Sequence, residues 1–202
     1  MTPQRRQRIE TTACTRQHDL TVLMERVHKP HNLAAVLRTC DAIGIQRAHA
    51  VPGDHGLPSL NNTSQGAQRW IDLERHPDTA TALGALKAAG FACHAAHFSR
   101  RAVDFRDVDY TRPTALVLGT EKFGVSDEAL ALCDGEIIIP MVGMTQSLNV
   151  SVAAAVILYE AQRQREAAGL YAPRDPAESP QRELIERWIA RDLARRRTPV
   201  QD

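Results

Sequence analysis

The stretch of residues 137–160 constrains the fold of this chain more than any other. It begins with three consecutive isoleucines, passes through a loop that contains Pro140 and Gly143, and continues as a long run of Ala, Val, Leu and Ile. The first part predicts a buried strand and the last part predicts a mostly buried helix. The loop between them carries four polar side chains, Thr145, Gln146, Ser147 and Asn149.

This polar loop has two interpretations. In an open α/β sheet, polar groups at a strand-to-helix turn lie where such folds usually bind ligands. A structural role explains the same residues about as well, because Asn149 can cap the helix and Thr145 and Ser147 are common turn residues. The loop alone leaves both interpretations open.

The rest of the chain alternates between predicted strands and helices. The strands are expected at residues 20–24, 48–51, 70–73, 91–98 and 114–119, and the helices at residues 3–16, 78–89 and 126–133. A further helix should start at Asn32, just after Pro30, and end at Gly44, whereas residues 99–113 look irregular. A last amphipathic helix has its apolar positions at Leu184, Ile185, Trp188, Ile189 and Leu193. The alternation predicts an α/β fold with a largely parallel sheet and helices on both faces.

Three segments are expected along the chain of 202 residues. Residues 1–17 form a basic helical extension, residues 18–165 one large α/β domain, and residues 166–202 a proline-containing linker followed by the amphipathic helix.

Composition excludes several classes of protein. No apolar run is long enough to span a membrane and no secretory signal is present, so we expect a cytoplasmic protein. The four cysteines are scattered and form no Cys-x-x-Cys pair, which indicates reduced, mostly buried thiols and no zinc site. Gly119 and Gly124 have the spacing of a phosphate loop, but Val125 and Ser126 follow where such a loop needs Lys and then Ser or Thr. No Gly-x-Gly-x-x-Gly occurs, so a nicotinamide or flavin cofactor on a Rossmann loop is not indicated.

The arginines are placed unevenly although the formal net charge is only +1. They crowd both ends of the chain, at Arg5, Arg6, Arg8, Arg195, Arg196 and Arg197. A solvated helix face is the commoner meaning of such runs, and a contact with an RNA backbone is the less common one.

Three motifs resemble those of a known family. This resemblance favours the functional interpretation of the polar loop and of the terminal arginines over the structural one. Residues 27–44, residues 118–126 and the stretch that includes Ile139-Pro140-Met141-x-Gly143-x-x-x-Ser147-Leu148-Asn149-Val150-Ser151 resemble motifs 1, 2 and 3 of the TrmH family. These are SPOUT-class RNA ribose 2′-O-methyltransferases. Residues 104–113 and 159–165 also look like the tRNA-acting branch of the family.

The resemblance implies properties that periodicity could not reveal. It implies a SPOUT-type α/β fold with a C-terminal trefoil knot, a homodimer, and S-adenosyl-L-methionine as cofactor. The implied partner is tRNA, with neither DNA nor a membrane involved, and no metal is called for. The family's catalytic positions fall on Asn32, Arg38, Glu121, Ser147 and Asn149, and its cofactor-binding positions on Ala96, Gly119, Ile139, Met144 and Leu148.

The reaction asks for an activated ribose hydroxyl in line with the methyl group. The family assigns this activation to Arg38, yet a guanidinium has no acceptor and stays protonated, so it is a poor general base. We therefore expect Arg38 to position the 2′-hydroxyl and stabilise its alkoxide character. Asn32 would hold Arg38 or the ribose, and Glu121, Ser147 and Asn149 would shape the loops. The terminal arginines would hold the RNA.

Two other functions stay open at this point. The same motifs serve rRNA 2′-O-methyltransferases, although the form of residues 28–32, the short N-terminus and the basic ends favour tRNA, and specifically guanosine-18 of the D-loop. A non-catalytic SPOUT-like RNA-binding protein would keep the fold and lose the chemistry, but the presence of Arg38, Ser147 and Asn149 argues against it.

Overall fold

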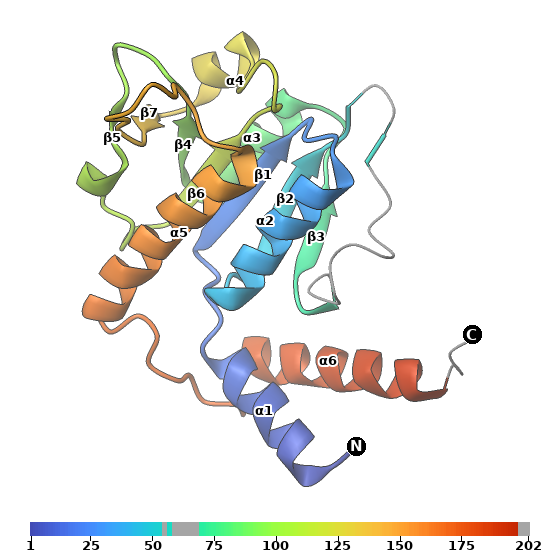
Figure 1. Cartoon of the computed structure of the whole chain (residues 1–202). Coiled ribbons are helices and arrows are strands. Elements are labelled where there is room, and N and C mark those ends of the chain that lie inside the picture. Colours follow the sequence, from blue (N-terminus) through green and yellow to red (C-terminus); the bar gives the residue numbers. More distant parts are fainter. Residues whose placement is uncertain (54–55, 58–68, 198–202) are drawn as a thin grey trace. The chain divides into compact units, whose positions relative to one another are not determined.

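The computed structural model describes residues 1–53, 56–57 and 69–197, with side chains described as far as residue 194. Two compact units divide the chain (Figure 1). The larger unit is His18–Leu170, and the smaller unit joins Met1–Gln17 to the C-terminal segment that starts at Tyr171. The two ends of the chain thus belong to one unit, although the sequence separates them.

The larger unit is built on a sheet of seven strands within the described residues. Their order across the sheet is β3-β2-β1-β6-β4-β7-β5, and every neighbouring pair is parallel. The strands are β1 (Leu20–Glu25), β2 (Arg47–Val51), β3 (Asp72–Arg75), β4 (Ala92–Ala96), β5 (Val103–Asp104), β6 (Thr114–Leu118) and β7 (Gly135–Ile138). The prediction of a largely parallel sheet is confirmed. All six residues of β1 are buried because neighbouring strands and helices cover it on every side.

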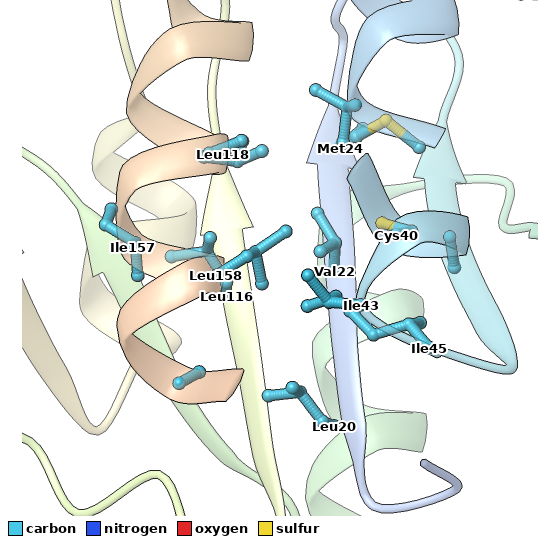
Figure 2. Packing of buried hydrophobic residues seen from close by; sticks show 14 of the residues in the cluster. Leu20, Val22, Met24, Cys40, Ile43, Ile45, Leu116, Leu118, Ile157 and Leu158 are labelled. Carbon is cyan, nitrogen blue, oxygen red and sulfur yellow. The ribbon is translucent and has the colours of Figure 1, made fainter. Parts of the chain in front are cut away.

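Helices cover both faces of the sheet, as the sequence predicted. On one face lie α2 (Pro30–Ala42) and α5 (Val150–Ala167), and on the other lie α3 (Thr79–Ala88) and α4 (Asp127–Leu132) (Figure 1). Each face has its own apolar core. Figure 2 shows the first core, in which side chains of β1 and β6 meet those of α2 and α5.

Three helix starts follow from local sequence. The side chains of Asp78, Ser126 and Asn149 each accept a hydrogen bond from a backbone N–H in the first turn of α3, α4 and α5. The predicted N-cap role of Asn149 is therefore confirmed.

The start of α2 was predicted wrongly. The helix begins at Pro30 and not at Asn32, and its N-cap residue Lys29 offers no side-chain cap. Proline is well suited to the first position of a helix, where its missing N–H has no intrahelical partner to lose. Asn32 is consequently inside the helix and buried, so its side chain is available for contacts elsewhere.

Two further segments differ from the prediction. The strand expected at residues 70–73 is β3, displaced to Asp72–Arg75. The segment expected to be irregular contains β5 and a short 3-10 helix, Phe105–Asp107. A two-residue strand is too short to produce a recognisable alternation of apolar and polar residues.

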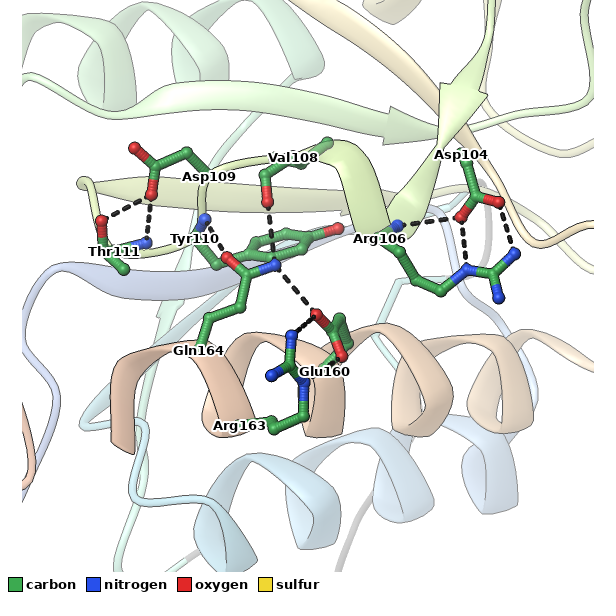
Figure 3. A network of polar contacts seen from close by, with 9 residues as sticks. All are labelled: Asp104, Arg106, Val108, Asp109, Tyr110, Thr111, Glu160, Arg163 and Gln164. Carbon is green, nitrogen blue, oxygen red and sulfur yellow. Dashed lines mark hydrogen bonds and ion pairs between the residues drawn. The ribbon is translucent and has the colours of Figure 1, made fainter. Parts of the chain in front are cut away.

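The segment after this 3-10 helix is fastened to α5. The Tyr110 backbone N–H donates to Oε1 of Gln164 at 3.0 Å, and Nε2 of Gln164 donates to the Val108 carbonyl at 3.1 Å and to Oε1 of Glu160 at 2.9 Å (Figure 3). Arg163 completes the network through two hydrogen bonds to Glu160. The two segments that resemble the tRNA-acting branch therefore pack against each other.

The helix α5 is less buried than its apolar sequence predicted. Ala154, Ile157, Leu158 and Ala161 face the core, but Val152, Val156 and Tyr159 are exposed, the last at 53% of its surface. These three residues recur at helical spacing and form an apolar stripe, which we call the α5 stripe.

The smaller unit pairs α1 (Pro3–Cys14) with α6 (Ser179–Arg197). Trp188 of α6 is buried and lies 4.8 Å from the Arg16 guanidinium, and Leu184 and Ile185 are buried beside it. The predicted apolar face of the last helix is thus confirmed near its middle, whereas Leu193 is 38% exposed.

Other expectations concern the whole chain. All four cysteines are free, and Cys14, Cys40 and Cys93 are buried, as predicted. Among the described residues, no helix is long and apolar enough to cross a membrane. The trefoil knot and the domain limits at residues 17 and 165 stay predictions.

Candidate active site

A cavity of about 540 Å³ opens at the carboxyl ends of β4, β6 and β7. Parallel strands end at the same edge of a sheet, so the loops that follow them meet there. The cavity wall is formed by Ala96 at the end of β4, residues 118–124 at and after the end of β6, and residues 137–139 with 146–150 around the end of β7. Segments that lie far apart in the sequence thus form a single site.

The loop after β6 closes into a tight hairpin at residues 119–124, which we call the glycine hairpin. The backbone N–H of Thr120 donates to the Gly124 carbonyl at 2.8 Å, and the N–H of Gly124 donates back at 2.9 Å. A Cβ atom at Gly119 would lie 2.0 Å from the backbone of Gly124, and Gly124 itself has a φ of +70°. Both positions therefore favour glycine, because a side chain at either one would strain the hairpin.

A chain of hydrogen bonds joins the three motifs at the rim of this cavity. Nδ2 of Asn149 donates to Oδ1 of Asn32 at 3.2 Å, and Nδ2 of Asn32 donates to Oε1 of Glu121 at 2.7 Å. Oε2 of Glu121 lies 3.0 Å from Nδ1 of His28. We call the two hydrogen bonds, from Asn149 to Asn32 and from Asn32 to Glu121, the amide relay. It spans 117 residues of sequence between Asn32 and Asn149.

The amide relay uses each group in a fixed sense. Oδ1 of Asn149 accepts from the backbone N–H and the hydroxyl of Ser151, which leaves its amide nitrogen as the donor to Asn32. Asn32 then accepts with its oxygen and donates with its nitrogen. Glu121 is therefore the acceptor at the end of the relay, a role that its ionised form fills with either oxygen.

The environment of Glu121 provides that ionised form. Burial raises the pKa of this carboxyl. Three other influences lower the pKa by more than burial raises it: the hydrogen bond from Asn32, backbone N–H groups including that of Lys29, and the nearby His28. The net effect is a pKa below the ordinary value for glutamate. The relay is therefore complete at neutral pH.

The structure brings most of the predicted site residues together. Of the predicted cofactor-binding residues, Ala96, Gly119, Ile139 and Leu148 line the cavity, and so do Glu121, Ser147 and Asn149. Met144 is fully exposed and lies outside the lining residues.

Asn32 and Arg38 are placed differently from each other, although both belong to α2. Asn32 is buried and reaches Glu121 and Asn149, and the expectation that it holds Arg38 or the ribose finds no support in these contacts. Arg38 is exposed and is not among the residues that line the cavity.

The predicted RNA-binding arginines also divide. Arg5 is partly buried in an ion pair with Asp192 at 3.0 Å, whereas Arg6 pairs with Glu10 on the surface and Arg8 is exposed. The side chains of Arg195, Arg196 and Arg197 lie outside the described residues, although their backbone belongs to α6.

Sequence reasoning missed several residues of the site. Lys29, His97, Phe98 and Met141 also line the cavity, and His28 pairs with Glu121; Gln146, another lining residue, was named in the polar loop but not as a site residue. Lys29 and Met141 lie within the recognised motifs, and that proximity was the available signal. His97 and Phe98 follow β4, and only the strand order shows that this loop reaches the cavity.

Fold and site together define the class of protein. The parallel sheet carries a ligand-sized cavity at the carboxyl ends of its strands. Backbone and apolar groups line this cavity, and amides and a carboxylate lie at its rim. Such a cavity is typical of the binding site of an enzyme. The SpoU rRNA methylase family model matches residues 19–159, and the chain belongs to this family.

Individual relatives agree with this assignment. The chain is 58% identical to a tRNA (guanosine(18)-2′-O)-methyltransferase of Thermus thermophilus over 189 residues, which cover 93% of this chain and 97% of the relative. The crystal structure of an A. aeolicus TrmH/SpoU tRNA modifying enzyme matches with a TM-score of 0.87 and 39% identity, covering 94% of this chain and 97% of that one. The SpoU methyltransferase AviRb from Streptomyces viridochromogenes, solved in complex with AdoMet, matches with a TM-score of 0.64 and 32% identity, covering 76% and 64%.

Proposed function

We propose that this protein transfers a methyl group from S-adenosyl-L-methionine to the ribose 2′-hydroxyl of guanosine-18 in the D-loop of tRNA. The observation that carries the proposal is the amide relay, which draws all three motifs to one cavity. The relative from Thermus thermophilus, similar over nearly its full length, is named for this reaction. A protein that acts on tRNA is expected in the cytoplasm.

The cavity residues fit the proposed cofactor. The glycine hairpin closes tightly because Gly119 has no Cβ, and its residues 119–124 line the cavity together with the apolar side chains of Ile139 and Leu148. Backbone donors and acceptors suit the adenine and amino-acid ends of such a molecule, and apolar side chains suit its ring. When bound, S-adenosyl-L-methionine supplies an electrophilic sulfonium methyl group.

The protein's own residues would divide the remaining work. Arg38, exposed and outside the cavity lining, takes no part in the cofactor pocket and can meet the substrate ribose and its phosphate. Its guanidinium would position the hydroxyl and stabilise the negative charge that develops on its oxygen. The amide relay would hold α2, the loop after β6 and the start of α5 in register, with Asn32 acting on Glu121 and Asn149 instead of on the ribose. Ser147 lines the cavity beside Asn149 and would contact the ligands directly.

Binding of tRNA would involve the terminal unit. Arg6 and Arg8 are exposed on α1, and Arg195, Arg196 and Arg197 lie at the end of α6. Arg5 would contribute less, because Asp192 already neutralises part of its charge.

A homodimer is also part of the proposal. The α5 stripe exposes Val152, Val156 and Tyr159 on a helix that begins at the cavity rim, and contiguous exposed apolar surface marks sites of protein–protein contact. A second copy of the chain is the partner that the family implies. Sedimentation of the native protein and of Val156→Glu, with Ala88→Glu on α3 as control, would test it: only the first substitution should yield monomers.

The experiment that tests the function is nucleotide mapping. Unmodified tRNA and rRNA are incubated with the protein and labelled donor, and the labelled nucleotide is located by nuclease digestion. We expect label at guanosine-18 of tRNA and no label in a transcript with adenosine at that position. Label confined to rRNA would support the rRNA-methylating alternative, and no label in either RNA would support a non-catalytic RNA-binding protein.

A further inference from the structure

Three metal-ligating side chains meet at the edge of the sheet, away from the cavity. They are His49 of β2, Glu74 of β3, and His76 just beyond the end of β3. None of them lines the cavity, and the proposed methyl transfer has no use for them. Among the described residues, these three side chains form the group whose possible metal-ligand atoms all lie within 4.8 Å of one another.

The convergence follows from strand geometry. His49 lies opposite Glu74 in the parallel register of β2 and β3. Glu74 and His76 are two residues apart, so their side chains leave an extended chain on the same face. The backbone N–H of His76 still donates to the Ala50 carbonyl at 3.0 Å, which continues the strand pairing to that residue.

The distances suit a shared ion. Nδ1 of His49 and Nε2 of His76 are 2.9 Å apart, and carboxylate oxygens of Glu74 lie 3.9 Å from the first and 3.8 Å from the second. A tetrahedral Zn²⁺ ion with bonds of about 2.0–2.1 Å separates its ligand atoms by roughly 3.3 Å. Small rotations of the three side chains would reach this value, and Glu74 is 43% exposed and can rotate.

Burial and charge also favour a metal. Both histidines are 7% exposed, so the ligand atoms are held in place. The Glu74 carboxylate brings a negative charge beside the two imidazole rings, and this ligand set suits a divalent cation. A hydrogen bond between the two histidines would involve only two of the three groups, whereas the strand register places the Glu74 carboxylate on the same face as both.

We propose that His49, Glu74 and His76 bind a divalent transition-metal ion, with Zn²⁺ fitting the ligand set best. Two imidazole nitrogens and one carboxylate oxygen leave a fourth position for water. Because β3 is the edge strand, the ion would link it to β2 and stabilise that edge. The site is structural and independent of the proposed methyl transfer.

One neighbouring cation competes with this ion. Nη1 of Arg47 lies 3.1 Å from a Glu74 oxygen, and both side chains are largely exposed. Binding of the metal would release Arg47 into solvent. Removal of the Arg47 charge should therefore tighten metal binding, whereas removal of any of the three ligands should weaken it.

The test uses the full chain, purified without a polyhistidine tag and treated with a chelator. Titration with Zn²⁺ by calorimetry should show one ion per chain, Co²⁺ should give the visible absorption of a tetrahedral site, and Zn²⁺ should raise the Tm. His49→Gln, His76→Gln and Glu74→Gln should lose the Co²⁺ spectrum and the Tm increase. Arg47→Gln should bind more tightly than the native protein, and the matched control His18→Ala, which removes an exposed histidine elsewhere, should bind as the native protein does.

Two results would overturn the proposal. Absence of one-to-one binding in the native protein would show that His49 and His76 are a hydrogen-bonded pair only. Binding unaffected by Glu74→Gln, a partly exposed position where the fold should tolerate the change, would place the metal elsewhere. Circular dichroism of each variant separates loss of the site from loss of the fold.

Discussion

Asn32 is the residue on which the candidate site depends most. Its amide accepts from Asn149 and donates to Glu121, so one side chain joins the helix α2 to the loop after β6 and to the start of α5. If a buried amide loses one hydrogen-bond partner, the free energy of unfolding falls by about 1–3 kcal/mol. The arrangement with both partners in place is therefore strongly preferred. Neither partner could be read from the local sequence, because they lie 89 and 117 residues away.

Arg38 allows the binding and chemical roles to be separated. Arg38→Ala should lower the rate of methyl transfer by about 10²- to 10³-fold or more, the usual cost of removing a group that stabilises developing charge. Donor affinity should be nearly unchanged, because Arg38 does not line the cavity. Calorimetric titration with donor and single-turnover assays would measure the two effects.

Arg38→Lys serves as the matched comparison. It should also fail, since a point charge cannot reproduce a planar set of donors. Loss of donor binding in either variant would contradict the assignment of Arg38 to the substrate.

At the scale of elements, the start of α5 combines a helix cap with a part of the site. Oδ1 of Asn149 caps the helix at the Ser151 N–H, and its Nδ2 donates to Asn32. One side chain thus stabilises the helix and aligns the polar loop that precedes it.

Two substitutions at Asn149 should separate these roles. Asn149→Ala removes both and should lower the free energy of unfolding by about 0.5–2 kcal/mol together with activity. Asn149→Asp keeps an acceptor at the N-cap but cannot donate to Asn32, so stability should stay near native while activity falls. Denaturant unfolding and transfer assays would measure both; full activity in Asn149→Asp would mean that Asn149 is only a cap.

The glycine hairpin permits a similar comparison. Gly119→Ala would place a Cβ 2.0 Å from the backbone of Gly124, so the loop must move and donor affinity should fall sharply. The control is Gly84→Ala in α3, where a Cβ meets nothing within 4 Å. It should raise the free energy of unfolding by roughly 0.5–1 kcal/mol through helix propensity alone. Equal donor affinity in the two variants would refute the role of the hairpin.

Across the whole molecule, local signals were readable from the sequence and long-range ones were not. Local sequence predicted the strand β1, the helices that start near Asp78 and Ser126, and the N-cap interpretation of Asn149, because each depends on neighbouring residues. Strand order depends on pairing between distant segments, so the placement of β5 beside β7 required the structure. The family motifs supplied the cavity residues but not the relay that joins them.

The charge distribution yields a prediction at this scale. Arg6→Gln combined with Arg8→Gln should weaken tRNA binding and reduce its dependence on salt, by a slope of about 0.7 to 0.9 for each phosphate that the protein no longer neutralises. Replacement of Arg195, Arg196 and Arg197 by Gln should act in the same way. Donor affinity should not change.

The control for these variants is Lys87→Gln, which removes a cation already paired with Asp134 at 2.9 Å and should leave the slope as it is. Titrations of labelled tRNA from low to moderate salt would measure each slope. Identical slopes for all variants and the native protein would mean that the terminal arginines are only solvated.

The central claim is that the cavity serves transfer of a methyl group to one ribose hydroxyl. The most direct measurement compares two tRNAs that differ in a single atom, one with guanosine and one with 2′-deoxyguanosine at position 18, each incubated with the native protein and labelled donor. We predict that the first tRNA takes up one methyl group per molecule and that the second binds but takes up none. Equal labelling of both tRNAs would contradict the claim, because the methyl group would then go to an atom other than that hydroxyl oxygen.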